Sequence, residues 1–256
     1  MILHWNVDPV LLHLGGFELR YYGLLFAAGF YIASIGLGRM FSAEGRDPKD
    51  LDVLLGYTIF GVVVGARLVH CLFYEPGFYL SHPLEILKVW KGGLASHGGV
   101  MGVFAAVYWF SRKKGYSFLW LLDRASIWAA LGGALIRLGN LFNSEIVGQP
   151  TGGDWGLVFE RVDQLPRHPT ALYEAACYLL VYAVTHALYT RSKDKRFGGR
   201  LFGLAMFGVF AARAVIEGLK ENQAAFEADM WLNMGQLLSL PFMALALFLM
   251  LRRNTR

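Results

Sequence analysis

Residues 136–148 read Ile-Arg-Leu-Gly-Asn-Leu-Phe-Asn-Ser-Glu-Ile-Val-Gly and place four polar side chains, Arg137, Asn140, Asn143 and Glu145, at the end of an apolar run. A cation and a carboxylate at the end of a membrane-length segment are costly unless they are paired or used. Arg137 and Asn140 are three residues apart, so they share one face if the segment is helical. A guanidinium offers a planar pair of donors to phosphate oxygens, and the amide adds another donor. We therefore interpret this stretch as an anion-binding site. A helix-end salt bridge with polar capping is the simpler alternative.

The composition around this stretch is that of a membrane protein. The chain has 256 residues, of which 55% are hydrophobic, and its mean hydropathy is +0.41. Soluble domains are rarely so apolar. The net charge of +5 does not call for nucleic acid, because Lys and Arg of membrane proteins gather in cytoplasmic loops and near anionic lipid. No Cys-x-x-Cys or His-Glu-x-x-His spacing is present, so we expect no metal, no cofactor and no nucleic-acid partner.

Seven apolar segments are long enough to cross a membrane as helices, since about twenty mostly apolar residues span the hydrocarbon core. They are residues 21–38, 51–73, 92–110, 118 into the Arg137 stretch, 170–189, 201–219 and 231–251. The sequence thus predicts an all-α, polytopic integral membrane protein with about seven transmembrane helices. Residues 1–256 form one transmembrane domain, with an N-terminal arm at residues 1–20 and an extracytoplasmic loop at residues 149–169.

The distribution of Lys and Arg predicts the orientation. The loops 39–50, 111–117 and 190–200 and the tail 252–256 together hold 14 of these cations, and the segments on the opposite side hold 6. Cations concentrate on the cytoplasmic side. The N-terminus is therefore expected outside and the C-terminus in the cytoplasm, with His97, Arg137 and Glu145 toward the outer half of the membrane.

A second polar segment is rich in glycine. Residues 92–99 read Gly-Gly-Leu-Ala-Ser-His-Gly-Gly, and such small residues let the backbone approach another helix or a ligand. His97 can take up a proton near neutral pH. A histidine that is hydrogen-bonded inside a helix bundle is the alternative. The flanking glycines and the outer position favour a functional histidine.

Two further ion pairs are possible. Arg213 and Glu217 lie four residues apart on one helix face and could pair, but Arg before Glu is the less favourable order on a helix. Two arginines that reach one phosphodiester would use the charge better. Arg67 could pair with Glu174, snorkel or be structural, and we favour a structural role.

The sequence resembles the prolipoprotein diacylglyceryl transferase family at two specific motifs. The family's Gly-Arg-x-Gly-Asn-x-x-Asn-x-Glu-x-x-Gly motif matches residues 136–148, except that Ile136 stands at the first Gly. The family's Gly-Gly-x-x-x-His-Gly-Gly motif matches residues 92–99. Supporting similarities are Tyr22-Gly23, Gly65–Leu68, Arg213–Glu217 and Asn233–Ser239, so that the resemblance runs through nearly the whole chain.

This resemblance implies an enzyme of the bacterial cytoplasmic (inner) membrane with its active site toward the extracytoplasmic side. Such enzymes transfer the diacylglyceryl group of phosphatidylglycerol to the lipobox cysteine thiol of a preprolipoprotein. A thioether forms and glycerol 1-phosphate leaves. The implied partners are phosphatidylglycerol, preprolipoprotein signal peptides and membrane lipid.

The site residues can be given expected roles in that reaction. His97 is expected to accept the thiol proton, and Arg137 and Arg213 are expected to stabilise the departing phosphate. The residues expected to bind phosphatidylglycerol are Tyr22, Arg137, Asn140, Glu145, Gly148 and Glu217.

The main alternative is a lipid or anion transporter or flippase, because intramembrane arginines also mark anion pathways. The chain shows no inverted repeat and no paired broken helices, which many transporters have. An intramembrane protease lacks support, since there is no Gly-x-Ser-x-Gly and no pair of membrane aspartates. The choice of general base, the acyl-chain preference, the oligomeric state and the lipoproteins modified are left open.

Overall fold

Each of the seven apolar segments forms a helix in the computed structural model, which describes residues 1–221 and 230–252. The helices are α1 (Tyr21–Ala43), α2 (Pro48–Val69), α3 (Pro76–Ser81), α4 (Ser96–Lys114), α5 (Phe118–Phe142), α6 (Thr170–Arg191), α7 (Arg200–Glu217) and α8 (Met234–Leu251). A π-helical turn, His70–Tyr74, extends α2, and two short 3₁₀ turns, Pro83–Leu87 and Val89–Lys91, precede α4. The strands are β1 (Ile2–Trp5), β2 (Val10–Leu14), β3 (Phe17–Arg20), β4 (Gly156–Phe159) and β5 (Pro166–Arg167).

Five described helices are long and apolar enough to cross a membrane, namely α1, α2 with its π-helical turn, α5, α6 and α8. The protein is thus mostly helical and polytopic, as predicted. The other two predicted spans, α4 and α7, are less uniformly apolar. Helix α4 ends in Arg112, Lys113 and Lys114, and α7 contains Arg200, Arg213 and Glu217.

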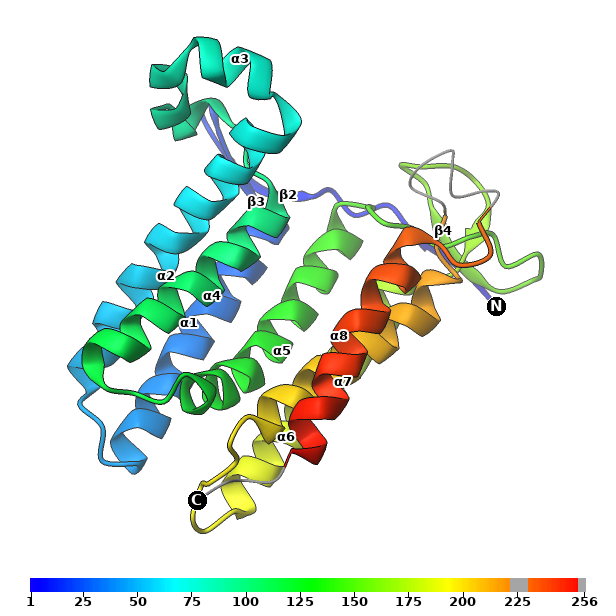
Figure 1. Cartoon of the computed structure of the whole chain (residues 1–256). Helices are drawn as coiled ribbons and strands as arrows, with labels where there is room; N and C mark the ends of the chain where they lie inside the picture. Colours follow the sequence, from blue (N-terminus) through cyan, green and yellow to red (C-terminus); the bar gives the residue numbers. More distant parts are fainter. Residues whose placement is uncertain (222–229, 253–256) are drawn as a thin grey trace. The chain divides into compact units, whose positions relative to one another are not determined.

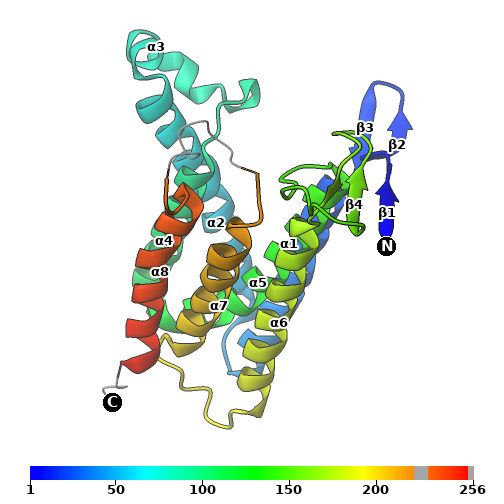
Figure 2. The same ribbon diagram turned by 90° about the vertical axis from the view of Figure 1, so that its right-hand side faces the viewer.

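The chain divides into two compact units. The first unit consists of Met1–Gly36 and Leu122–Arg256, and the second of Leu37–Leu121. Helices α6, α7 and α8 of the first unit pack side by side (Figures 1 and 2). In the second unit, α2 packs along α4 (Figure 1).

Glycines let α1 and α5 approach closely in the first unit. A Cβ on Gly29 would lie 3.3 Å from the Cα of Gly132, and one on Gly139 would lie 2.7 Å from the Tyr22 ring. Atoms at such distances leave no room for a larger side chain. Ile136, which replaces a glycine of the family motif, is only half-buried. The close contact between the two helices therefore does not depend on a glycine at that position.

The N-terminal arm and the 149–169 loop contain short β-strands. Strand β1 pairs in parallel with β4, and β4 pairs antiparallel with β5 (Figure 2). Strands β2 and β3 form a separate hairpin. These strands have only two to five residues, which is too short for an alternating pattern to be recognised. The chain is thus mostly helical rather than all-α, and the strands lie in the predicted N-terminal arm and the 149–169 loop.

A small core anchors this sheet to the end of α5. The buried side chains of Leu141, Leu157 and Phe159 form a cluster against which Trp5 packs. The Trp5 indole also donates a hydrogen bond to the Leu141 carbonyl at 3.0 Å. The N-terminal arm is therefore tied to the residues that follow Arg137 along α5.

Arg167 holds the 149–169 loop in place. Its guanidinium is buried and binds the Asp163 carboxylate, the Gly148 carbonyl at 2.9 Å and the Glu221 carboxylate at 2.6 Å. The hydrogen bond from Arg167 holds the pKa of Asp163 below its ordinary value of 3.8. Both groups are therefore charged at neutral pH, and the loop is folded against the segments on either side of it.

A buried carboxylate caps the start of α7. Asp123 of α5 is fully buried and accepts hydrogen bonds from the backbone N–H groups of Gly199 at 2.8 Å and Phe202 at 3.0 Å. The first N–H groups of a helix have no partner within the helix. Asp123 therefore serves as the cap of a helix distant in sequence.

In the second unit, glycines also set the contact between α2 and α4. A Cβ on Gly61 would lie 2.5 Å from the Gly102 carbonyl oxygen, and one on Gly65 would lie 3.0 Å from the Gly102 Cα. Gly61 and Gly65 form a small-xxx-small pattern, which lets two helices approach closely.

Arg67 has a structural role in this unit. Its side chain is buried and donates hydrogen bonds to the carbonyls of Ile86 (2.9 Å), Gly92 (2.5 Å) and Glu85 (2.5 Å). It also stacks over the Tyr79 ring, with 4.9 Å between the guanidinium carbon and the ring centroid. A single cation thus organises the connection between α2 and α4.

We expect the Arg67→Ala variant to be less stable by about 2–4 kcal/mol, because several buried carbonyls would lose their donor. Thermal unfolding of the purified protein in detergent measures this. Arg112→Ala, which removes an exposed arginine of α4, is the matched control. Unchanged stability together with lost activity would instead place Arg67 in the functional site.

Candidate anion-binding site

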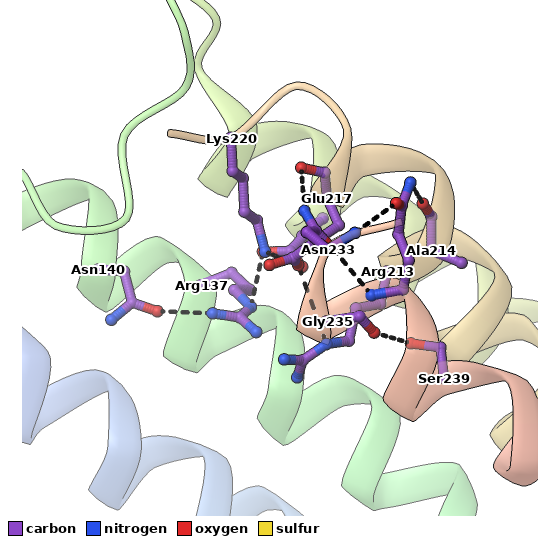
Figure 3. A network of polar contacts seen from close by, with 11 residues as sticks. Arg137, Asn140, Arg213, Ala214, Glu217, Lys220, Asn233, Gly235 and Ser239 are labelled. Atoms are coloured by element: carbon purple, nitrogen blue, oxygen red, sulfur yellow. Dashed lines mark hydrogen bonds and ion pairs between the residues drawn. The ribbon is translucent and has the colours of Figure 1, made fainter. Parts of the chain in front are cut away.

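Five charged side chains of the first unit form one connected group, which we call the charged cluster (Figure 3). Its members are Arg137 on α5, Glu174 on α6, Arg213 and Glu217 on α7, and Lys220 just after α7. Three cations and two carboxylates leave one net positive charge in the cluster. The cluster therefore joins three helices and favours an anion.

Glu174 lies at the centre of the cluster and is fully buried. Its Oε2 is 3.0 Å from the Arg137 Nε, and its Oε1 accepts a hydrogen bond from the Lys220 Nζ at 3.0 Å. A buried carboxylate is costly unless it is paired and hydrogen-bonded. The possible partner of Glu174 was uncertain from the sequence. The structure pairs it with Arg137 and Lys220.

Glu217 is bound mainly by Lys220. The Lys220 Nζ donates to Glu217 Oε2 at 2.9 Å, and the Arg213 Nε lies 3.9 Å from the same oxygen. The predicted pair of Arg213 and Glu217 is therefore a long contact. The side chain of Arg213 is 38% exposed, against 9% for Glu217. Arg213 is thus the more accessible partner of this pair.

A chain of amide hydrogen bonds extends from Arg137. The Arg137 Nη1 donates to Asn140 Oδ1 at 3.3 Å, and Asn140 Nδ2 donates to Glu145 Oε2 at 3.1 Å. Asn143 Nδ2 donates to the other Glu145 oxygen at 3.1 Å. Glu145 therefore orients Arg137 only through Asn140. The four polar residues that the sequence singled out do form one network.

The turn after α5 holds Glu145 in position. Ser144 and Ile146 have φ values of 53° and 54°, which non-glycine residues rarely adopt and which cost roughly 1–3 kcal/mol each. The Thr170 hydroxyl binds the Ile146 carbonyl at 2.9 Å. The surrounding contacts thus maintain a strained turn beside the cluster.

Gly148 and Tyr22 have packing contacts in the structure. The Gly148 N–H donates to the His168 carbonyl at 3.1 Å, and a Cβ at this position would lie 2.6 Å from the His168 Cβ. Tyr22 is half-buried at the start of α1, against Gly139. Both residues therefore lie next to the residue 136–148 stretch, and their binding of phosphatidylglycerol stays a prediction.

His97 belongs to the second unit. It lies in the first turn of α4, its side chain is exposed, and the neighbouring glycines Gly98 and Gly99 are buried. The glycines pack toward α2, where a Cβ on Gly98 would lie 2.7 Å from the Val69 Cβ. The close approach predicted for this segment is thus between helices, and the role of His97 as a proton acceptor stays a prediction.

Sequence reasoning missed Lys220. It was counted among the cations of an outer loop, but its side chain is only 4% exposed. Its position three residues after Glu217 was the available signal, since residues three apart on a helix can pair. Asn233 is the N-cap of α8. Its side chain and that of Gln236 form a capping box at the start of α8.

The described residues contain no group of three His, Cys, Asp or Glu side chains placed to hold a metal ion. The groups that could hold a ligand are the accessible faces of Arg137 and Arg213 and the polar turn after α5. Within the described chain, Asn143 Oδ1 and Ser144 Oγ are buried without a hydrogen-bond partner. Both atoms can accept a hydrogen bond from a ligand hydroxyl.

Comparison with known proteins gives one consistent result. The sequence profile of the family described as prolipoprotein diacylglyceryl transferase matches residues 9–252. A protein of Tolumonas auensis named phosphatidylglycerol–prolipoprotein diacylglyceryl transferase is 51% identical over 251 residues, covering 98% of this chain and 97% of the relative. Proteins with the same name from Chloroherpeton thalassium and Nitrosomonas europaea are 44% and 40% identical, covering 96% and 98% of this chain and 92% and 91% of those relatives.

The position of Gly235 on α8 gives a test of the cluster's packing. A Cβ at Gly235 would lie 2.6 Å from the Glu217 Oε1, so Gly235→Ala should push this carboxylate away from Lys220. We expect a loss of about 1–3 kcal/mol in the free energy of unfolding, measured by thermal denaturation in detergent.

Gly218→Ala is the matched control, because a Cβ there would lie 3.6 Å from its nearest neighbours and the residue has helical φ and ψ angles. If the two variants unfold at the same temperature, the carboxylate of Glu217 is not held as tightly as the structure indicates.

Proposed function

The chain belongs to the prolipoprotein diacylglyceryl transferase family, and on that premise we propose that it transfers the diacylglyceryl group of phosphatidylglycerol to the cysteine thiol of a prolipoprotein. The acceptor cysteine lies in the lipobox of a signal peptide. The products are a thioether-linked lipoprotein precursor and glycerol 1-phosphate, and the reaction is the first step of lipoprotein maturation.

One observation carries this proposal for the site. Arg137 and Arg213 come from different helices and are joined by a buried chain of carboxylates and one lysine. Two guanidinium groups held in this way can bind one phosphodiester from two sides. The substrate of the proposed reaction carries such a phosphodiester, and the leaving product carries a phosphate of higher charge.

The proposed reaction is a direct displacement. The thiolate attacks the glyceryl carbon that is bonded to the phosphate oxygen, the C–S bond forms, and the C–O bond breaks with its electron pair on the leaving glycerol phosphate. A cysteine thiol with a pKa of about 8.5 must first lose its proton. We assign this proton to His97, directly or through water. Arg137 and Arg213 stabilise the negative charge that develops on the phosphate.

The polar turn after α5 fits the glycerol headgroup of phosphatidylglycerol. Asn140 and Glu145 are proposed to bind the headgroup hydroxyls, with Tyr22 at the start of α1. Asn143 Oδ1 and Ser144 Oγ offer two further acceptors, since both are buried without a partner among the described residues. Glu217 and Gly148 contribute by holding the cations and the loop around this pocket.

The proposed setting is the bacterial cytoplasmic membrane, with seven spanning helices, the N-terminus outside and the C-terminus in the cytoplasm. Helices α4 and α7 complete the five strongly apolar helices. In this arrangement the 149–169 loop and the N-terminal arm lie on the outer side and cover the site.

A mass-spectrometric assay tests the function. Purified protein in detergent is mixed with phosphatidylglycerol and a lipobox peptide that contains one cysteine. A peptide that is heavier by one diacylglyceryl group, with glycerol phosphate released in equal amount, supports the transferase. A folded, lipid-binding protein that leaves the peptide unmodified contradicts it and turns attention to lipid transport.

Arg137→Ala should lower turnover by at least about a thousandfold while leaving the protein folded, because one of two phosphate-binding cations is lost from the transition state. The same peptide assay measures the rate. Arg161→Ala, at an exposed position of the 149–169 loop, is the control and should retain the rate. Full activity of Arg137→Ala would remove this residue from the phosphate site.

His97→Ala should lower the rate at neutral pH and shift its rise with pH toward the thiol's own pKa of about 8.5, because the proton acceptor of the thiol would be missing. The assay is repeated from pH 5.5 to 9 with an excess of both substrates. His82→Ala removes another exposed histidine of the second unit and serves as the control. An unchanged pH profile would show that His97 has only a structural role.

A further inference from the structure

Lys220 is buried between two carboxylates and takes no part in the roles assigned above. Its Nζ lies 3.0 Å from Glu174 Oε1 and 2.9 Å from Glu217 Oε2, and its side chain is 4% exposed. A buried ammonium group is costly unless its partners are equally well placed. A buried lysine between these two carboxylates therefore needs a physical explanation.

The backbone at Lys220 is fixed by the segment that follows the 136–148 stretch. The Gln149 N–H donates to the Leu219 carbonyl at 2.8 Å, and the Glu221 N–H donates to the Val147 carbonyl at 3.4 Å. The Gln149 side chain donates to the Lys220 carbonyl at 3.1 Å. These bonds hold the main chain on either side of Lys220, so its side chain points into the cluster from a fixed position (Figure 3).

Cations and carboxylates alternate along the cluster. Arg137 contacts Glu174, Lys220 contacts Glu174 and Glu217, and Glu217 contacts Arg213. Without Lys220, two carboxylates would face two arginines and the net charge would be zero. With Lys220, both carboxylates already have a cationic partner. The excess of one positive charge is then available at the two arginines.

The two arginines at the ends of the cluster are more exposed than the lysine between them. Lys220 is 4% exposed, Arg137 is 16% exposed and Arg213 is 38% exposed. The Arg137 guanidinium also forms side-chain hydrogen bonds with Asn140 and Tyr178, whereas the Arg213 Nε lies 3.9 Å from Glu217 Oε2. The excess positive charge is therefore accessible to a ligand at the guanidinium groups of the two arginines.

We propose that Lys220 is a positioning residue that neutralises Glu174 and Glu217 so that Arg137 and Arg213 can bind the substrate phosphate. This inference rests on the proposed function and adds a residue to it. Lys220 does not touch the substrate. It acts by preventing the two carboxylates from competing with the phosphate for the arginines, and by fixing Glu174 where it orients the Arg137 guanidinium.

A purely structural role of Lys220 makes a different prediction. In that case, any variant that removes the two hydrogen bonds of Nζ would be inactive in proportion to its loss of stability. In our proposal, activity follows the balance of charge in the cluster. A second substitution that removes one carboxylate charge should then restore activity to a variant that lacks the lysine.

Three variants separate these roles: Lys220→Arg, Lys220→Met, and the double variant Lys220→Met with Glu174→Gln. Lys220→Arg keeps the charge, and Lys220→Met removes it. The double variant again has one more cation than carboxylates. Gln has nearly the same size as Glu and keeps one oxygen that can face the Arg137 Nε, which makes an ion pair with Glu174 Oε2 at 3.0 Å.

Two readouts are measured for each variant and for the wild type. The first is kcat and KM in the peptide assay, and the second is the affinity of the detergent-solubilised protein for sn-glycerol 1-phosphate by calorimetry. Thermal unfolding reports stability. The binding measurement tests the inference even if the wild type transfers no lipid, so a failure of the proposed function is distinguished from a failure of this inference.

We expect Lys220→Met to lose at least about tenfold in kcat and in affinity for glycerol 1-phosphate, which corresponds to about 1.4 kcal/mol. Lys220→Arg should retain most of both. The double variant should recover most of what Lys220→Met loses.

Two results would overturn the inference. One is a folded Lys220→Met protein with wild-type kcat and anion affinity. The other is a folded double variant that is as inactive, and binds the anion as weakly, as Lys220→Met. If Lys220→Met alone fails to fold, the double variant and Lys220→Arg still decide. The inference requires both to bind the anion with near wild-type affinity.

Discussion

The carboxylate of Glu174 is completely out of contact with solvent, and the arrangement of the first unit around it depends on that fact. A buried carboxylate must be paired with cations, because it has no contact with water. Arg137 reaches it from α5, and Lys220 from the segment after α7. One ionised group on α6 thereby fixes where two other helices place their cations.

Close helix packing makes this arrangement possible. Gly139 brings α1 against α5 beside Arg137, and Gly235 brings α8 against Glu217. A side chain at either glycine would occupy the space of a ring or of a carboxylate. The polar network and the glycines therefore depend on each other. The glycines let the helices approach closely, and this close packing shields the charged groups from water.

The 149–169 loop and the turn after α5 hold residues of the same network in place. Arg167 holds the 149–169 loop, and the loop in turn contacts Gly148 and Glu221, next to Lys220. The strained turn at Ser144 and Ile146 sets Glu145 against Asn140. Such a preorganised group of donors suits a reaction in which charge develops on a phosphate, since the donors need not reorganise when the bond breaks.

The sequence by itself determined the helices, the membrane class and the polar stretch of residues 136–148, because apolar length and helical spacing are local properties. It also led to the family, through motifs whose residues are close together in the chain. The partner of Glu174, the cap that Asp123 provides for α7, and the role of Lys220 were decided only by the tertiary structure. Glu174 and Lys220 are 46 residues apart and Asp123 and Gly199 are 76 apart, and no local pattern says which helix faces which.

The short strands were missed for the same reason. Strand β1 has no partner until residues 156–159 arrive beside it, and an isolated strand of four residues carries no periodic signal of its own. Local chemistry thus predicted an anion site at the end of α5. The sharing of two carboxylates by one lysine is a property of packing, because it requires α6, α7 and the segment after α7 to bring their side chains to one buried point.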